Sequence, residues 1–211
     1  MWDESKARRG SQEVSSCLLI DLNKMDISVR EVNYYSDRCA GQNHNFVICM
    51  MFSSYMHKCY AENRNLTVRH KFMTSGHSHM EVDSVHASIE KAKKRTTMDI
   101  ETPRDWAVFV SAIERRVPFV VHEMEQKEFL AFKTLEDRFR KPKHNSQGEL
   151  IRFKEISWFE YRSDNPGIVF YKYTLNDKDF MSFDINQKDA KEHLPQVLPP
   201  ISCDPIPLSN E

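Results

Sequence analysis

Apolar residues recur every three or four positions in several segments of the chain, which is the spacing of a helix that buries one face. The clearest helix start is at Thr102, a helix-capping residue type, with Pro103 at the first helical position and Asp105 three residues after the cap. This helix should end before Pro118. The other helices predicted from the same spacing span residues 11–22, 44–58, 84–95 and 125–139.

Strands are predicted where β-branched and aromatic residues concentrate, or where apolar and polar residues alternate. Residues 27–36 predict a buried strand that ends at Asp37, and residues 66–73 alternate as a strand with one buried face does. Strand, helix, strand and helix in this order indicate an α/β layer arrangement. Further strands are predicted over residues 151–161, 168–175 and 180–185, the first two separated by a turn signal at 164–167.

The change of pattern along the chain divides it into three parts. Residues 1–117 hold the α/β arrangement. Residues 118–194 hold one more helix and the later short strands, which we expect to form a small antiparallel β unit. Residues 195–211 contain five prolines and few charges, which predicts an extended tail that packs on a surface or stays mobile.

The composition is typical of a globular intracellular protein. The 211 residues are 40% hydrophobic and 29% charged, which is enough apolar material for a core. No apolar run approaches the roughly 20 residues of a membrane helix, and the N-terminus lacks the apolar region of a signal peptide. The five cysteines form no CxxC pair, so we expect a reducing compartment, nuclear or cytoplasmic, and no disulfide-linked partner.

The formal net charge is only −1, whereas a strongly basic nucleic-acid binder would carry more positive charge. Basic residues nevertheless gather in two clusters, which are candidates for contacts to phosphates and weak indications of a nuclear address. Solvated helix ends and loops carry similar clusters, so that alternative stays open. The first cluster is Lys91, Lys93, Lys94 and Arg95, and the second is Arg138, Arg140, Lys141 and Lys143.

Asp37 is the first candidate for chemistry, because it stands at the carboxyl end of a predicted strand, before a turn and a helix. Sites in open α/β sheets gather at the carboxyl ends of strands. A carboxylate at such a place can bind Mg²⁺, which prefers oxygen ligands. The alternative is an ordinary aspartate that caps a turn or a helix.

A second candidate set lies on the predicted helix that follows residues 76–83. Asp83, His86 and Glu90 are spaced so that they fall on one helix face. With Asp37 they could complete a site for two metal ions that clamps the attacking and leaving oxygens of a phosphodiester. The alternative is a polar helix face with Asp83 as its N-cap.

Cys39 could belong to one of two further kinds of site, a zinc site or a nucleophilic cysteine site. His77, His79 and His86 with Cys39 supply zinc-ligand residue types, but their spacing matches no common structural zinc pattern. Cys39 paired with His77 or His79 would be a nucleophile, although no oxyanion-hole motif stands beside it. The sequence contains no Walker A motif and no GxGxxG.

Two motifs stand in a fixed order along the chain, YSDRCAGQN at residues 35–43 and GHSHMEVDSVHASIE at residues 76–90. Together with RGSQEVSSCL at 9–18 and TPRDW at 102–106, they resemble an uncharacterised domain family that is common in animal genomes and associated with mobile elements. The resemblance extends to about residue 185. Such domains are similar to divergent members of the RNase H-like superfamily, which includes DDE transposases and exonucleases.

The resemblance implies a three-layer mixed sheet with flanking helices. In this superfamily one catalytic acid lies on the first strand, one on the fourth and one on a later helix. The first three strands should precede the helix at 11–22, where only ten residues stand, so the chain is expected to begin partway through the domain and to lack its first strands.

The resemblance also implies roles for individual residues. Asp37 corresponds to the fourth-strand acid, and Asp83, with His86 or Glu90 nearby, to the later one. The implied catalytic residues are Asp37, Asp83 and Glu90; the implied ligands of Mg²⁺ or Mn²⁺ are Asp37, Asp83 and His86; and the supporting residues are His77, Gln42 and Asn43.

Three functions remain open at this point. The first is a metal-dependent nuclease or transposase-type enzyme that acts on DNA or RNA, with Asp37 and Asp83 as metal ligands. The second is a catalytically inactive relic of such an element that binds nucleic acid or another protein, with the basic clusters on the phosphates. The third is a plain α/β domain in which the two acids only cap helices.

Overall fold

A computed structural model describes residues 1–73, 80–187, 197–204 and 206–207 of the chain. The helices in this part are α1 (Ser11–Lys24), α2 (Phe46–Ala61), α3 (Glu81–Lys93) and α4 (Pro103–Ser111). The strands are β1 (Glu31–Ser36), β2 (Thr67–Phe72), β3 (Trp158–Arg162), β4 (Ile168–Lys172) and β5 (Met181–Asp184). Short 3-10 helices follow at η1 (Gln126–Glu128), η2 (Phe132–Asp137) and η3 (Phe153–Glu155).

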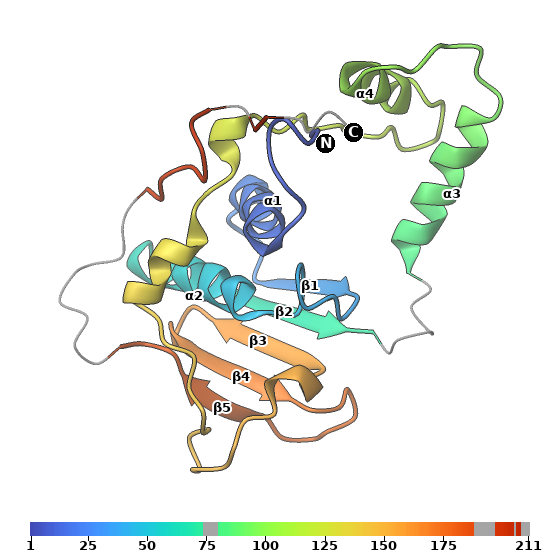
Figure 1. The fold of residues 1–211 in the computed structure, drawn as a ribbon. Coiled ribbons are helices and arrows are strands. Elements are labelled where there is room, and N and C mark those ends of the chain that lie inside the picture. Colours follow the sequence, from blue (N-terminus) through green and yellow to red (C-terminus); the bar gives the residue numbers. More distant parts are fainter. Residues whose placement is uncertain (74–79, 188–196, 205, 208–211) are drawn as a thin grey trace.

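The strands form one mixed sheet in the order β1-β2-β3-β4-β5. β1 and β2 run parallel, with Glu31 opposite Thr67 and Ser36 opposite Phe72, and the other neighbours are antiparallel. A parallel pair needs a crossover, which α2 supplies. The predicted α/β fold is confirmed, and the antiparallel strands extend the same sheet instead of forming a separate unit (Figure 1).

The core lies between α2 and one face of the sheet. α2 is buried along most of its length, because α1, η2 and the sheet all contact it. A helix that is hydrophobic on nearly every side suits this central place. Phe52 of α2 packs on Tyr161 of β3 with 5.0 Å between ring centres. Burying one side chain of this size contributes about 1.5–3 kcal/mol.

The helices that pack on the sheet lie on one of its faces. Figure 1 shows α1 and α2 on the same side, and the inward strand residues belong to a single core with α2. Successive strand residues point to opposite faces. On the second face Arg69, Lys71, Trp158 and Arg162 are each partly exposed. The described residues thus form two layers at the sheet, whereas the resemblance implied three.

The helix ends follow the sequence signals in part. Thr102 caps α4 as predicted, since its side chain accepts a hydrogen bond from Asp105 N at 3.1 Å. α1 is capped by Gly10, whose N–H donates to Glu13 Oε2 at 3.1 Å. α3 begins at Glu81, so the sequence placed its start too late.

The helix predicted over residues 125–139 is wrong. The structure has two 3-10 helices there, because backbone groups between them bond to other parts of the chain. Leu130 N donates to Ser16 Oγ at 2.9 Å, and Ala131 N donates to Pro199 O at 2.8 Å. The bond from Ala131 N to Pro199 O also shows that the described part of the proline-rich tail packs on the surface, which is one of the two alternatives predicted.

The strand predicted over residues 27–36 forms only from Glu31. Asp26 ends the preceding segment in a turn, in which Ser28 N donates to Asp26 Oδ1 at 2.8 Å and Val29 N donates to Asp26 O at 3.1 Å. The side chain and the backbone carbonyl of Asp26 thus each accept one hydrogen bond from an N–H group that a longer strand would have used. The predicted strands after residue 151 are likewise shorter than expected.

α3 and α4 stand away from the sheet and form an arm beside α1 (Figure 1). None of the α3 residues is buried. α4 buries only Ala107, Phe109 and Val110. The arm is therefore the part of the described molecule with the least packing.

The longest described helix, α2, has 16 residues. No helix in the described ranges is long and apolar enough to cross a membrane. All five cysteines are free thiols. Burial raises the pKa of Cys49 to about 12 and that of Cys59 to about 11, so both core thiols stay protonated at neutral pH.

Candidate functional site at the ends of the parallel strands

Asp37 lies directly after β1, where its carboxylate organises the turn that leads into α2. Its Oδ1 accepts hydrogen bonds from Cys39 N at 3.0 Å and from Asn43 Nδ2 at 2.7 Å. Cys39 O in turn accepts from Asn43 N at 2.8 Å and from His44 N at 3.0 Å. The side-chain amide of Asn43 thus holds the Asp37 carboxylate. The side-chain amide of Gln42 donates instead to Arg9 O at 3.1 Å.

His44 follows this turn and is buried in a cage of aromatic rings. Its ring centre lies 4.3 Å from that of Phe72 and 5.6 Å from that of Phe153. Nε2 donates to Ile156 O at 2.8 Å. Burial lowers the pKa of His44, and the positive charges of Arg38 and Lys141 lower it further. The imidazole is thus a neutral structural group that ties the Asp37 turn to Ile156, just before β3.

His70 of β2 fixes the end of β1 from the inner face. Its Nε2 lies 2.7 Å from Ser36 Oγ, and Ser36 Oγ donates to Asp37 O at 3.2 Å. Burial lowers the pKa of His70 to about 3, so the ring is neutral. Its buried Nδ1 has no partner among the described residues. A neutral ring that donates from Nε2 leaves only an acceptor unpaired, which is the less costly arrangement.

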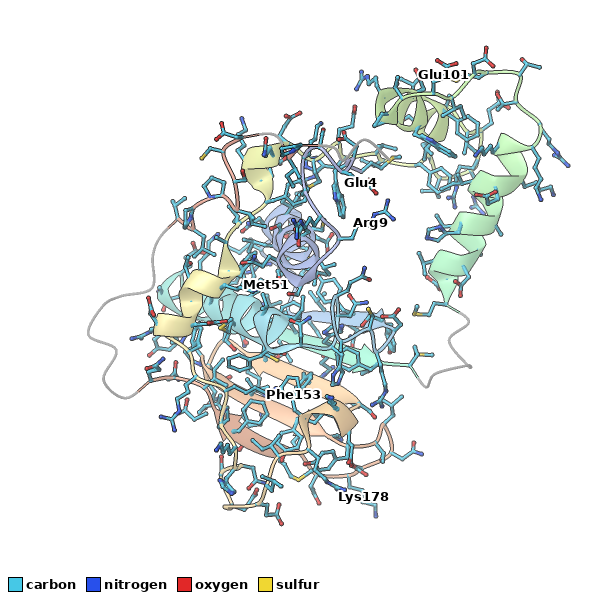
Figure 2. All side chains as sticks on the ribbon, in the orientation of Figure 1. Glu4, Arg9, Met51, Glu101, Phe153 and Lys178 are labelled. Atoms are coloured by element: carbon cyan, nitrogen blue, oxygen red, sulfur yellow. The ribbon has the colours of Figure 1, made fainter. Side chains whose placement is uncertain are left out.

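Two cations reach the same end of the sheet from separate parts of the chain. Arg38 donates to Ser157 Oγ and, at 3.4 Å, to Lys154 O. Lys141 of the second basic cluster lies 3.9 Å above the ring of Phe153. Figure 2 shows Phe153 beside the sheet, on the 3-10 helix that precedes β3. Because Phe153 also packs on His44, Lys141 of the second basic cluster lies near the Asp37 turn.

The rest of the second cluster lies along the same loop. Arg140, Lys141 and Lys143 are all exposed. The backbone of this loop is fixed, since Arg140 N donates to Ile185 O at 2.7 Å and Ile151 N donates to Lys143 O at 2.9 Å. The cations are therefore exposed side chains on an anchored backbone.

The acids of α3 do not join Asp37. Asp83 is the third residue of the helix and not its N-cap, which is Met80, and its Oδ2 accepts a hydrogen bond from Met80 N at 2.7 Å. His86 and Glu90 are exposed. His86 and Ile89 instead face α1 across a cavity of about 530 Å³. Among the described residues, no three His, Cys, Asp or Glu side chains are placed to hold a metal ion together.

The first basic cluster ends α3, away from the Asp37 turn (Figure 1). Lys93 lies 4.5 Å above the ring of Trp106, which joins α3 to α4. Lys91, Lys94 and Arg95 are exposed. His77 and His79 lie outside the described residues, and so do the zinc and cysteine sites that depend on them.

The buried histidines His44 and His70 were not predicted as part of the site, although the sequence carries a signal for His70. His70 alternates with Val68 and Phe72 in β2, so the strand period already places it on the buried face. Arg38 was also missed as a candidate, because a single cation inside a turn motif has no pattern of its own. Comparison of the chain with protein-family models, curated proteins and solved structures gave no match.

Proposed function

We propose that this chain is a nucleic-acid-binding protein of RNase H-like type that holds phosphates at the carboxyl ends of β1 and β2. The observation that carries the proposal is that Arg38 and Lys141 both contact the segment 153–157, which packs on His44 at the end of the Asp37 turn. Cations placed together on an anchored backbone suit the phosphates of a nucleic acid, whose binding is largely electrostatic.

The RNase H-like ancestry is supported by the arrangement of the parallel pair. β1 and β2 are joined by the buried helix α2, and an acid follows the first of these strands. The resemblance places the fourth-strand acid in this position, at Asp37. The same geometry puts polar groups where open α/β sheets usually bind their ligands.

The first test is a change of Lys141 to Gln, with Lys133→Gln as the matched control. Both lysines are exposed, but Lys133 lies on η2 and away from the Asp37 turn. We expect Lys141→Gln to weaken binding of DNA and RNA oligonucleotides of any sequence and to lower the salt slope, d(log K)/d(log[salt]), by about 1. Equal affinities and equal slopes for the two variants would contradict the proposal.

A second candidate function, metal-dependent cleavage, is favoured by one observation. Asp37 is exposed, and only its Oδ1 is used by the turn, so Oδ2 remains available to a cation. The described residues place no group of three or more His, Cys, Asp or Glu side chains around it, which is fewer ligands than a two-metal site requires. The described set does not fit that site, and no cleavage step follows from it.

The test of this candidate is the melting temperature of the chain at increasing Mn²⁺ concentration, with Asp37→Asn beside it. A ligand that binds only the folded state stabilises it by about 2.7 kcal/mol at a hundredfold excess over Kd. A saturating rise that is absent in Asp37→Asn is expected if Asp37 binds metal. A rise of the same size in both proteins removes Asp37 from the ligand set.

A further inference from the structure

The sheet face opposite α1 and α2 carries a row in which aromatic rings and cations alternate. Its rings come from β1, β3, β4 and the loop before β5, and its cations come from β2, β3 and β4. Each cation lies over two rings. In order of successive contacts the row is Tyr35, Lys71, Trp158, Lys172, Phe180, Arg162 and Phe170.

The spacing within the row is close. Lys71 Nζ lies 5.3 Å from the ring centre of Tyr35 and 4.2 Å from that of Trp158. Lys172 Nζ lies 4.9 Å from the ring centre of Trp158 and 4.3 Å from that of Phe180. These separations fall within the distance at which a cation is attracted to the face of a ring.

The far end of the row is closed by its own contacts. Lys172 is buried, and its Nζ donates to Asp177 O at 2.7 Å and to Lys178 O at 3.2 Å. Arg162 is paired with Glu160. Figure 2 shows Lys178 on the loop at the edge of the sheet farthest from α1. Ligands therefore have little access to this part of the row.

The near end of the row is open. Tyr35 is 55% exposed although it lies within a strand. Lys71 forms no ion pair with any described residue, and its Nζ donates to Tyr35 Oη at 3.3 Å. Trp158 is partly exposed beside it. An accessible ring, an unpaired cation and a second ring thus stand next to one another.

We propose that this open end binds single-stranded nucleic acid, with bases stacked on Tyr35 and Trp158 and a phosphate on Lys71. The inference rests on the proposed function and adds the class of ligand to it. Tyr35 stands two residues before Asp37 in the chain, so the stacking surface begins at the same end of β1 as the Asp37 turn.

Duplexes do not fit this surface as well as single strands do. Paired bases hide their faces within the helix, whereas unpaired bases can stack on aromatic side chains. The positive charge of Lys71 complements the backbone, and its flexible stem allows the ammonium group to move from a ring to a phosphate. Recognition by stacking and charge also tolerates most sequences.

The decisive variant is Tyr35→Ala, with Tyr60→Ala as the matched control. Tyr60 is 62% exposed and ends α2 on the other side of the sheet, so both substitutions remove an exposed tyrosine. Binding to a labelled oligothymidylate is measured by fluorescence anisotropy. We expect Tyr35→Ala to raise Kd by roughly fivefold to a hundredfold, which is the usual effect of losing one stacked base, and Tyr60→Ala to leave it unchanged.

A second readout reports on Trp158 directly. In a Trp2→Phe, Trp106→Phe background Trp158 is the remaining tryptophan, and stacking should quench its emission as oligothymidylate is added. Unchanged emission, an unchanged Kd in Tyr35→Ala, or a blunt duplex that binds as tightly as the single strand would each overturn the inference. If Lys141→Gln still weakens binding in that case, the phosphate site stands without the stacking surface. A chain that binds no oligonucleotide overturns both proposals.

Discussion

Single residues at the strand ends act mainly by holding the backbone in place. Asp37 and His70 are both polar groups near a candidate site, yet their bonds go to the turn and to Ser36. Asp37 keeps one oxygen free, whereas His70 is enclosed. A polar residue near a strand end can therefore either bind a ligand or only hold the backbone, and its hydrogen-bond partners show which of these roles it has.

The burial of His70 should make the protein sensitive to mild acid. Its pKa is about 3 in the folded chain and near 6.5 when unfolded, so between these values only the unfolded state takes up the proton. The free energy of unfolding must then decrease as the pH falls below 6.5, whereas above pH 6.5 the contribution of neutral His70 to stability is complete. From pH 7 to pH 5 we expect His70 alone to remove about 2 kcal/mol.

Urea unfolding at several pH values measures this effect, with His70→Gln as the comparison. Glutamine can still donate a hydrogen bond to Ser36 but does not titrate. The variant should therefore lose less stability than the parent between pH 7 and pH 5. Parallel pH profiles for the two proteins would show that His70 is not the group responsible.

Some properties of single residues could be predicted from the sequence and others could not. Asp37 was placed correctly at a strand end, because a Val- and Tyr-rich run stops there before a turn signal. The hydrogen-bond partner of Asp83 could not be predicted, because an acid that caps a helix and an acid that binds a metal occupy the same positions in the sequence pattern. Tyr35 was missed as a surface residue, because its exposure depends on β1 having a neighbour on one side only.

Elements differ in where their stability comes from. α2 is held by the core on all sides, whereas α4 has nine residues and a partly buried face. Short helices are marginal without tertiary support, so their caps matter more. The segment at 125–139 shows the reverse case, because tertiary bonds to Ser16 and Pro199 overrode a helical pattern.

Thr102→Ala should loosen α4 without unfolding the sheet. The substitution removes the bond from Asp105 N to Thr102 Oγ1, and loss of such a cap costs about 1 kcal/mol. We expect the amides of α4 to exchange roughly fivefold faster with deuterium, as one expects of local opening. Thr97→Ala is the control, because Thr97 is exposed and outside any described helix. Equal protection of α4 in both variants would mean that packing alone holds the helix.

The whole molecule combines a two-layer body and a loosely packed arm. The body could be anticipated as α/β from the alternation of strand and helix, but the joining of both strand sets into one sheet could not. That joining requires β2 to pair with β3, and the pairing residues are far apart in sequence. Local patterns carry no information about such a partner, whereas a crossover between nearby parallel strands follows from chain length alone.

The pairing of β2 with β3 has one more consequence. Lys71 lies opposite Trp158, which closes a loop of 86 residues, 72–157, that contains the whole arm. The entropy of closing a loop grows only with the logarithm of its length, so doubling the loop would add about 0.6 kcal/mol. The stability of the sheet thus depends little on the length of the segment inserted between β2 and β3. The arm could be lengthened, shortened or exchanged between related chains while the body keeps its fold.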